Sequence, residues 1–149
     1  MQDADLIVTG KKMLLLGSKN TCLEHAAVAV KGDEIIAVGD SKKIVNQYKA
    51  KKTIEAGDAL IMPGFVNCHT HAAMTCFRGI ADDLELMDWL NNYIFPAEAK
   101  NVNEELAYWG SLLGIAEMIK SGTTTFCDMY IFEDETARAA REAGMRCLI

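Results

Sequence analysis

From residue 60 onward, segments of strand length alternate with segments of helix length, and this alternation limits the fold more than any other feature. The apolar run 60–67 predicts a strand buried on both faces, and the β-like runs 123–130 and 145–149 predict two more strands. The segments 103–122 and 133–144 predict helices that end in glycine. Strands and helices in this order are typical of an α/β protein with a parallel sheet or barrel.

The predicted helix 103–122 carries an apolar pattern at helical spacing, which we expect to face the core. Its members are Leu106, Trp109, Leu113, Ala116 and Ile119. The polar stretch 76–101 before it is too long for a simple loop, and residues 83–95 are expected to hold some helix.

Residues 4–60 have a different character and predict short strands joined by turns. Strands are expected at 4–10 and 12–17, separated by Gly10-Lys11, and a hairpin at 26–40 turns at Gly32-Asp33. A short helix at 41–50 would have Ser41 as N-cap, and a strand pair would follow at 53–64. We therefore predict two parts, 1–59 and 60–149.

Composition narrows the class of protein. Half of the 149 residues are hydrophobic and the net charge is -6, which argues against a nucleic-acid partner or an acidic membrane. The acidic start lacks the features of a signal peptide, and no apolar run is long enough to span a membrane. The five cysteines are scattered without a C-x-x-C pair, which fits reduced thiols and predicts a cytoplasmic protein.

Two of the three histidines, His69 and His71, stand one residue apart where the apolar run 60–67 gives way to polar residues. Side chains alternate along a strand, so both imidazoles point to one face and can reach one divalent ion, although an H-x-H pair alone is a weak signal. A catalytic zinc usually has three protein ligands. Asp128, at the end of the next strand, could reach a metal, but a structural role is favoured for it, and His25 is expected to be a surface or packing residue.

The segments LIMPGFVNCHTHAAMTCFRGIADDLELMDWL and GTTTFCDMY resemble the amidohydrolase superfamily. Within it, the chain is most similar to the branch of 5-methylthioadenosine/S-adenosylhomocysteine deaminases and related chlorohydrolases. The resemblance implies a (β/α)8 TIM-type barrel preceded by strands of a small β-sandwich. Residues 1–59 would be the N-terminal part of that sandwich, and 60–149 the first β/α units of the barrel. The sequence would then stop in the third barrel strand, as the N-terminal part of a longer protein. Ala73 departs from the proline that the family often has there.

The resemblance also assigns roles to individual residues. His69 and His71 match the family's first metal-binding motif, while its other ligands and its proton-shuttling acid come from later strands without counterparts here. Glu98 matches the glutamate that binds the ribose hydroxyls, although a solvated loop acid is the alternative. Trp89 would line the nucleoside pocket or belong to the core. Arg78, Asp82 and Asp83 fit a family loop that ion pairs could hold in place.

The implied reaction is the metal-dependent hydrolytic deamination of an adenine nucleoside, a small molecule, with release of ammonia. Zinc is the expected divalent metal, with iron, manganese or nickel as alternatives. The protein could also form a homo-oligomer. One alternative is a related amidohydrolase acting on guanine, cytosine or a chlorotriazine. The other is an inactive fragment or non-catalytic relative. The 149 residues alone are expected to be inactive.

Overall fold

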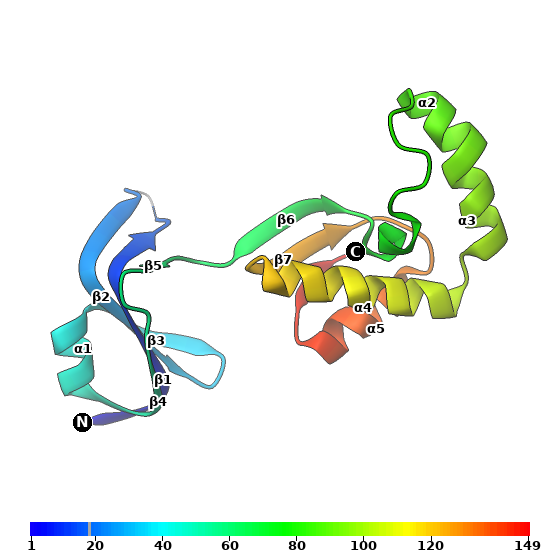
Figure 1. Cartoon of the computed structure of the whole chain (residues 1–149). Coiled ribbons are helices and arrows are strands. Elements are labelled where there is room, and N and C mark those ends of the chain that lie inside the picture. The colour runs from blue at the N-terminus through cyan, green and yellow to red at the C-terminus, as the bar shows by residue number, and fades with distance from the viewer. Residues whose placement is uncertain (18) are drawn as a thin grey trace. The chain divides into compact units, whose positions relative to one another are not determined.

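The structure is a computed structural model, and it describes residues 1–17 and 19–149. The chain forms two compact units, Met1–Pro63 and Gly64–Ile149 (Figure 1). This division lies four residues after the predicted one at residue 60.

The first unit is a sheet built around one long strand, β1 (Gln2–Leu15). β1 pairs antiparallel with β2 (Thr21–Lys31), which pairs with β3 (Glu34–Asp40), and it pairs parallel with β4 (Tyr48–Glu55). The short β5 (Leu60–Ile61) also pairs with β1. The predicted hairpin 26–40 is confirmed, since β2 and β3 turn at Gly32, whose φ of 60° suits glycine.

Three local predictions for this unit are wrong. The two strands expected at 4–10 and 12–17 are one strand, because β1 continues through Gly10 and pairs on both sides of it. The expected strand pair 53–64 does not form, because β4 and β5 each pair with β1. The helix α1 (Ser41–Gln47) is capped by Asp40 rather than Ser41, since Asp40 Oδ1 accepts a hydrogen bond of 3.0 Å from Lys43 N.

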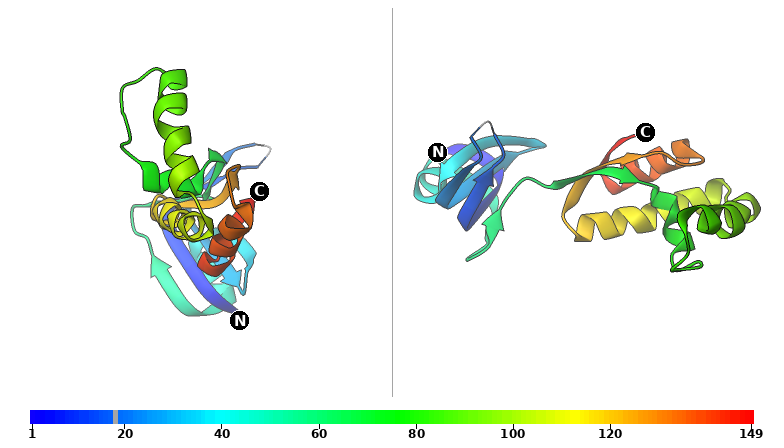
Figure 2. Two further views of the ribbon diagram at one scale, coloured as in Figure 1. Left: turned by 90° about the vertical axis from the view of Figure 1, so that its right-hand side faces the viewer. Right: turned by 90° about the horizontal axis from the view of Figure 1, so that it is seen from above.

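The second unit contains a parallel sheet with two long helices on one face, as the alternation of segments predicts. The strands β6 (Phe65–Thr70), β7 (Thr123–Asp128) and β8 (Arg146–Leu148) lie in the order β6-β7-β8. The helices α4 (Glu104–Lys120) and α5 (Glu133–Ala143) lie side by side against this sheet (Figures 1 and 2). The core between helices and sheet consists of Ala72, Ile115, Phe126, Ala139, Ala140 and Met145.

Between β6 and α4 the chain forms four short helical elements. The 3₁₀ helix η1 (Ala72–Phe77) follows β6 and packs on α4. The segment α2 (Leu86–Trp89), η2 (Leu90–Ile94) and α3 (Phe95–Asn101) then forms one continuous helical arm that projects from the unit (Figure 1). The helix expected within residues 83–95 is thus present, and the arm continues to Asn101.

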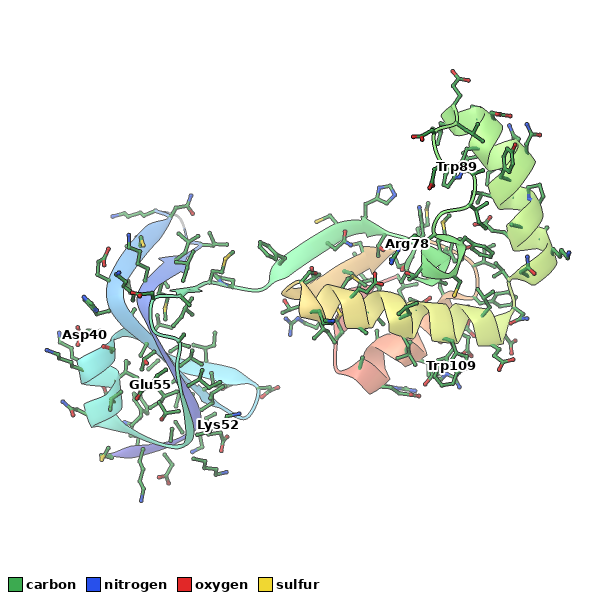
Figure 3. The ribbon with its side chains drawn as sticks, viewed as in Figure 1. Asp40, Lys52, Glu55, Arg78, Trp89 and Trp109 are labelled. Atoms are coloured by element: carbon green, nitrogen blue, oxygen red, sulfur yellow. The ribbon has the colours of Figure 1, made fainter. Side chains whose placement is uncertain are left out.

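The predicted apolar face of α4 is wrong. Trp109, Leu113 and Ile119 are 60%, 49% and 52% exposed; Figure 3 shows the side chain of Trp109. The buried face consists mainly of small residues: Ala107, Gly110, Ser111 and Gly114, with Ile115. Small residues are needed there because η1 comes very close, and a Cβ on Gly110 would lie 2.6 Å from the Ala73 carbonyl oxygen.

The prediction that residues 60–67 form one strand buried on both faces is also wrong. Leu60 and Ile61 pair with β1 of the first unit, and β6 begins only at Phe65. Phe65 and Val66 are 55% and 58% exposed. Among the helices of the described residues, none is long and apolar enough to cross a membrane.

Candidate active site

The two histidines of the H-x-H pair converge at the end of β6, with His69 in the strand and His71 directly after it. Their Nε2 atoms lie 3.4 Å apart, and their rings are nearly perpendicular, at 79°. His71 is oriented by its other ring nitrogen, because Nδ1 lies 2.5 Å from the carbonyl oxygen of Met129. A carbonyl only accepts, so Nδ1 carries the proton, and Nε2 of a neutral His71 keeps a free lone pair.

This geometry fits a metal ion held by both histidines. Zinc binds imidazole nitrogen at 2.0–2.1 Å, and two such nitrogens in a tetrahedral shell lie about 3.3 Å apart. The hydrogen bond from His71 Nδ1 to a carbonyl is the usual way in which a metal-binding histidine is held. Within residues 1–17 and 19–149, however, no group of three or more His, Cys, Asp or Glu side chains forms a metal site. The described residues therefore offer two candidate ligands, His69 and His71.

Asp128 is the last residue of the neighbouring strand β7, and its carboxylate holds backbone groups in place. Its side chain is buried; Oδ2 accepts a hydrogen bond from Ala72 N and Oδ1 one from Met129 N, both of 2.8 Å. Burial raises the pKa of the Asp128 carboxyl, and the two backbone hydrogen bonds and His71 oppose that rise. Asp128 thus fixes the residues that follow His71 and those that precede Tyr130.

A largely apolar pocket of about 530 Å³ brings several predicted site residues together. It is lined by His71, Met74, Leu86, Trp89, Leu90, Ile94, Phe95, Glu98, Met129, Tyr130 and Ile131. His71 comes from the end of β6, whereas Trp89 and Glu98 come from the helical arm. His69 is exposed and is not among the lining residues. The pocket thus combines an imidazole that is oriented to bind a metal, a carboxylate and an apolar wall.

Glu98 is held by a residue that sequence reasoning missed. The Tyr130 hydroxyl donates a hydrogen bond of 2.7 Å to Glu98 Oε1. Burial and this bond raise the pKa of Tyr130 far above its usual value, so the phenol stays protonated and remains a donor. The position of Tyr130 in the sequence could have indicated a site residue. Tyr130 follows the carboxyl end of β7, where barrel enzymes have their active-site residues.

Trp89 lies at the wall of the pocket and is only partly buried, so it is not one of the core residues. Its ring lines the pocket, and its Nε1 donates a hydrogen bond of 2.9 Å to the carbonyl oxygen of Ile80. Figure 3 labels Trp89 on the helical arm. The indole therefore belongs to the pocket wall and also ties the arm to the loop that precedes it.

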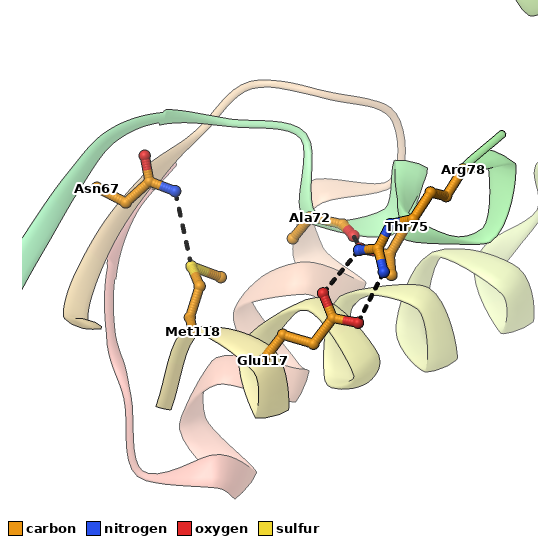
Figure 4. Close-up of polar contacts among 6 residues, drawn as sticks. All are labelled: Asn67, Ala72, Thr75, Arg78, Glu117 and Met118. Carbon is orange, nitrogen blue, oxygen red and sulfur yellow. Dashed lines mark hydrogen bonds and ion pairs between the residues drawn. The ribbon is translucent and has the colours of Figure 1, made fainter. Parts of the chain in front are cut away.

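Arg78 forms an ion pair, but its partner is not one of the loop acids. Its guanidinium makes two hydrogen bonds to the Glu117 carboxylate on α4, of 3.0 and 2.6 Å (Figure 4). The side chains of Asp82 and Asp83 are exposed. Asn67 Nδ2 lies 3.8 Å from Met118 Sδ. This is a second contact between the β6–η1 segment and α4, and it is drawn in Figure 4.

The sequence is similar to those of known deaminases. The 5-methylthioadenosine/S-adenosylhomocysteine deaminase 1 of Syntrophus aciditrophicus is 61% identical over the whole chain, which covers 34% of that protein. The 5'-deoxyadenosine deaminase of Methanocaldococcus jannaschii is 50% identical over 82% of the chain and 28% of its own length. The chain thus spans about a third of the curated relatives that it matches.

Solved structures show the same fold. An adenosine deaminase from Xanthomonas campestris with bound zinc matches with a TM-score of 0.95 and 37% identity, over 99% of this chain and 34% of the other. A guanine deaminase from Escherichia coli matches with a TM-score of 0.79 and 23% identity, over 95% and 36%, which supports the fold alone. The model of the amidohydrolase family matches residues 60–149, more than half of the chain. The chain belongs to the amidohydrolase family.

Proposed function

We propose that the protein is a metal-dependent deaminase that hydrolyses the C6 amine of an adenine nucleoside of the 5-methylthioadenosine/S-adenosylhomocysteine type and releases ammonia. The observation that carries the proposal is the pocket lined by both His71 and Glu98, which are held by the neighbouring residues Met129 and Tyr130. Relatives named as deaminases of such nucleosides support it. Since the chain spans a third of their length, the proposal concerns the whole protein.

The cofactor in this proposal is a divalent metal, with zinc as the first candidate. His69 and His71 would hold it through Nε2, and their 3.4 Å separation supports this pairing. A bound metal of this kind lowers the pKa of water and supplies a nucleophile near neutral pH. The zinc in the Xanthomonas campestris structure supports the choice of metal.

The residues of this chain would bind and orient the substrate. Glu98, as a carboxylate, can accept hydrogen bonds from two vicinal ribose hydroxyls. The apolar walls contributed by Trp89, Leu86 and Ile94 would exclude water from the base and contact its faces. Holding the nucleoside at its ribose fixes where the base lies, and such positioning can contribute several kcal/mol to lowering the barrier.

We also propose a small-molecule substrate as the binding partner and the cytoplasm as the location of the protein. The substrate is a small molecule, and the net charge of -6 argues against nucleic acid. The scattered cysteines are all free thiols in the structure, which supports a reducing compartment such as the cytoplasm.

The experiment is a substrate comparison with the protein expressed from its complete reading frame and loaded with zinc. Ammonia release would be measured with S-adenosylhomocysteine, 5-methylthioadenosine, free adenine, guanine and cytosine. We expect kcat/KM for the two nucleosides to exceed that for free adenine by at least about 100-fold, because only they carry the hydroxyls that Glu98 can bind. Faster ammonia release from guanine or cytosine, or chloride release from a chlorotriazine, would contradict the proposal and favour the alternative amidohydrolase reaction.

A further inference from the structure

The helical arm that carries Glu98 is linked to the segment after β7 by a side-chain hydrogen bond. Among the hydrogen bonds of the described residues, the bond from Tyr130 to Glu98 is the one that joins residues 86–101 to residues 64–77 and 104–149. The indole bond of Trp89 reaches only Ile80, in the loop that leads into the arm. Ile94 of the arm is buried and packs against the unit, while Tyr130 supplies the hydrogen bond that orients the Glu98 carboxylate.

Tyr130 is itself fixed by the chain on both sides of it. Its backbone N–H donates to the Glu133 carboxylate at the start of α5. The preceding residue, Met129, accepts the hydrogen bond from His71 Nδ1 through its carbonyl oxygen. The Tyr130 ring centroid lies 6.0 Å from that of His71. The segment 128–130 thus holds both the metal-binding imidazole and the carboxylate of the arm.

The hydrogen bond leaves Glu98 with a defined free side. Oε1 accepts from the phenol, while Oε2 has no hydrogen-bond partner within residues 1–17 and 19–149. An ionised carboxylate only accepts hydrogen bonds. Oε1 can therefore accept from the protonated phenol of Tyr130, while Oε2 can accept from a hydroxyl of the substrate. A substrate without that hydroxyl would leave a partly buried carboxylate oxygen unpaired, and such losses cause strong discrimination.

We propose that Tyr130 is a positioning residue that makes the site selective for a vicinal diol, because its hydroxyl holds Glu98 Oε1 and so presents Oε2 to the substrate. The inference rests on the proposed function, and it adds the residue that sets the choice between a ribose and a deoxyribose substrate. Tyr130 acts through Glu98 and takes no part in the chemical step.

The test compares a ribonucleoside with its 2′-deoxy analogue in the complete, zinc-loaded protein. The variants are Tyr130→Phe and a matched control, Tyr108→Phe, which removes a Tyr–Glu hydrogen bond of 2.6 Å between Tyr108 and Glu142, outside the pocket. We expect Tyr130→Phe to reduce the ratio of the two kcat/KM values at least about 10-fold, through loss on the ribonucleoside. Tyr108→Phe should leave the ratio unchanged.

A double-mutant cycle with Glu98→Gln separates positioning from general destabilisation. If Tyr130 acts through Glu98, Tyr130→Phe should have almost no further effect on the ratio in the Glu98→Gln background. Additive losses would mean that Tyr130 merely supports the fold and would overturn the inference. If Tyr130→Phe does not fold, Tyr130→Gln, which can donate, should keep more of the preference than Tyr130→Leu, which cannot.

A binding measurement separates failure of this inference from failure of the proposed function. Calorimetric titration with inosine and 2′-deoxyinosine reports the diol preference without turnover. If the unmodified protein acts on nucleosides and binds inosine more tightly, but Tyr130→Phe keeps that preference, only the inference about Tyr130 is overturned. If the unmodified protein neither deaminates nor binds any nucleoside, the proposed function fails and the inference fails with it.

Discussion

At the scale of single residues, the orientation of His71 matters more than its presence in an H-x-H pair. The carbonyl of Met129 fixes the proton on Nδ1 and leaves Nε2 available to a metal. The sequence could predict the pair, because alternation along a strand places both imidazoles on one face. It could not predict the carbonyl, which comes from 58 residues further along the chain.

The first prediction concerns metal content. In the complete protein, His69→Asn and His71→Asn should each lower zinc affinity by at least about 10–100-fold, since each removes a direct ligand. His25→Asn is the matched control, because His25 is exposed, lies in the first unit and has a φ of 48°, a conformation that asparagine tolerates. Zinc per chain would be measured by mass spectrometry after dialysis. Full zinc content in both site variants would show that the pair does not hold the metal.

At the scale of elements, the close approach of η1 to α4 fixes the segment that follows the two histidines. Gly110→Ala would place a Cβ 2.6 Å from the Ala73 carbonyl oxygen and 3.0 Å from Cys76 Sγ. Alanine normally stabilises a helix relative to glycine, yet we expect a loss of about 1–3 kcal/mol here because the core is overpacked. Gly39→Ala is the control, with nothing within 4 Å of its added Cβ. Denaturant unfolding measures the free energy of unfolding of both variants. A Gly110→Ala variant that is more stable than the unmodified protein would contradict the close packing of η1 on α4.

The ion pair between Arg78 and Glu117 also joins the η1 segment to α4, and it should make stability depend on pH. The hydrogen bond from Arg78 lowers the pKa of Glu117 below its ordinary value of 4.5. A depressed pKa in the folded state means that the contribution is present above the unfolded pKa and is lost as the pH falls through the folded pKa. The melting-temperature difference between the unmodified protein and Glu117→Gln should therefore shrink between pH 7 and acid.

The control for this pH series is Glu55→Gln, an exposed carboxylate for which the described residues show no ion pair. The difference in melting temperature between the unmodified protein and Glu55→Gln should be small at neutral pH. Because the Arg78–Glu117 pair is exposed, the effect will be modest even near neutral pH. A difference for Glu117→Gln that grows in acid would reverse the sign argued here.

The elements show which parts of the fold the sequence could reveal. The order of strands and helices from residue 60 follows from local periodicity, so it was predictable. The buried face of α4 was not, because hydropathy favours Trp109 and Leu113, whereas contact with η1 requires Gly110 and Gly114. The pairing of β4 and β5 with β1 was not predictable either, because it is set by contacts distant in sequence.

At the scale of the whole molecule, the 149 residues leave much apolar surface exposed for their size. Phe65 and Val66 on β6 are more than half exposed, and so are Trp109 and Ile119 on α4. Large exposed apolar patches and unpaired strand edges favour association with other chains. Within residues 1–17 and 19–149, no group of three or more His, Cys, Asp or Glu side chains forms a metal site, whereas a catalytic zinc usually has three protein ligands.

The last prediction therefore concerns residues 1–149 expressed alone. We expect them to self-associate at concentrations of about 10 µM and above, to bind zinc weakly, and to release no ammonia from 5-methylthioadenosine. Light scattering after size-exclusion chromatography measures the association. Replacing Trp109, Leu113 and Ile119 by glutamine should shift the chain toward the monomer, because it removes the exposed apolar side chains of α4.

The matched control replaces three exposed apolar residues of the first unit by glutamine, namely Leu16, Ile35 and Val45. If both triple variants shift association equally, general surface hydrophobicity and not the α4 face drives it. A monomer at about 100 µM without any substitution would contradict the prediction outright. Ammonia release by these residues alone would mean that two histidines suffice to hold a catalytic metal, against the usual requirement for a third protein ligand.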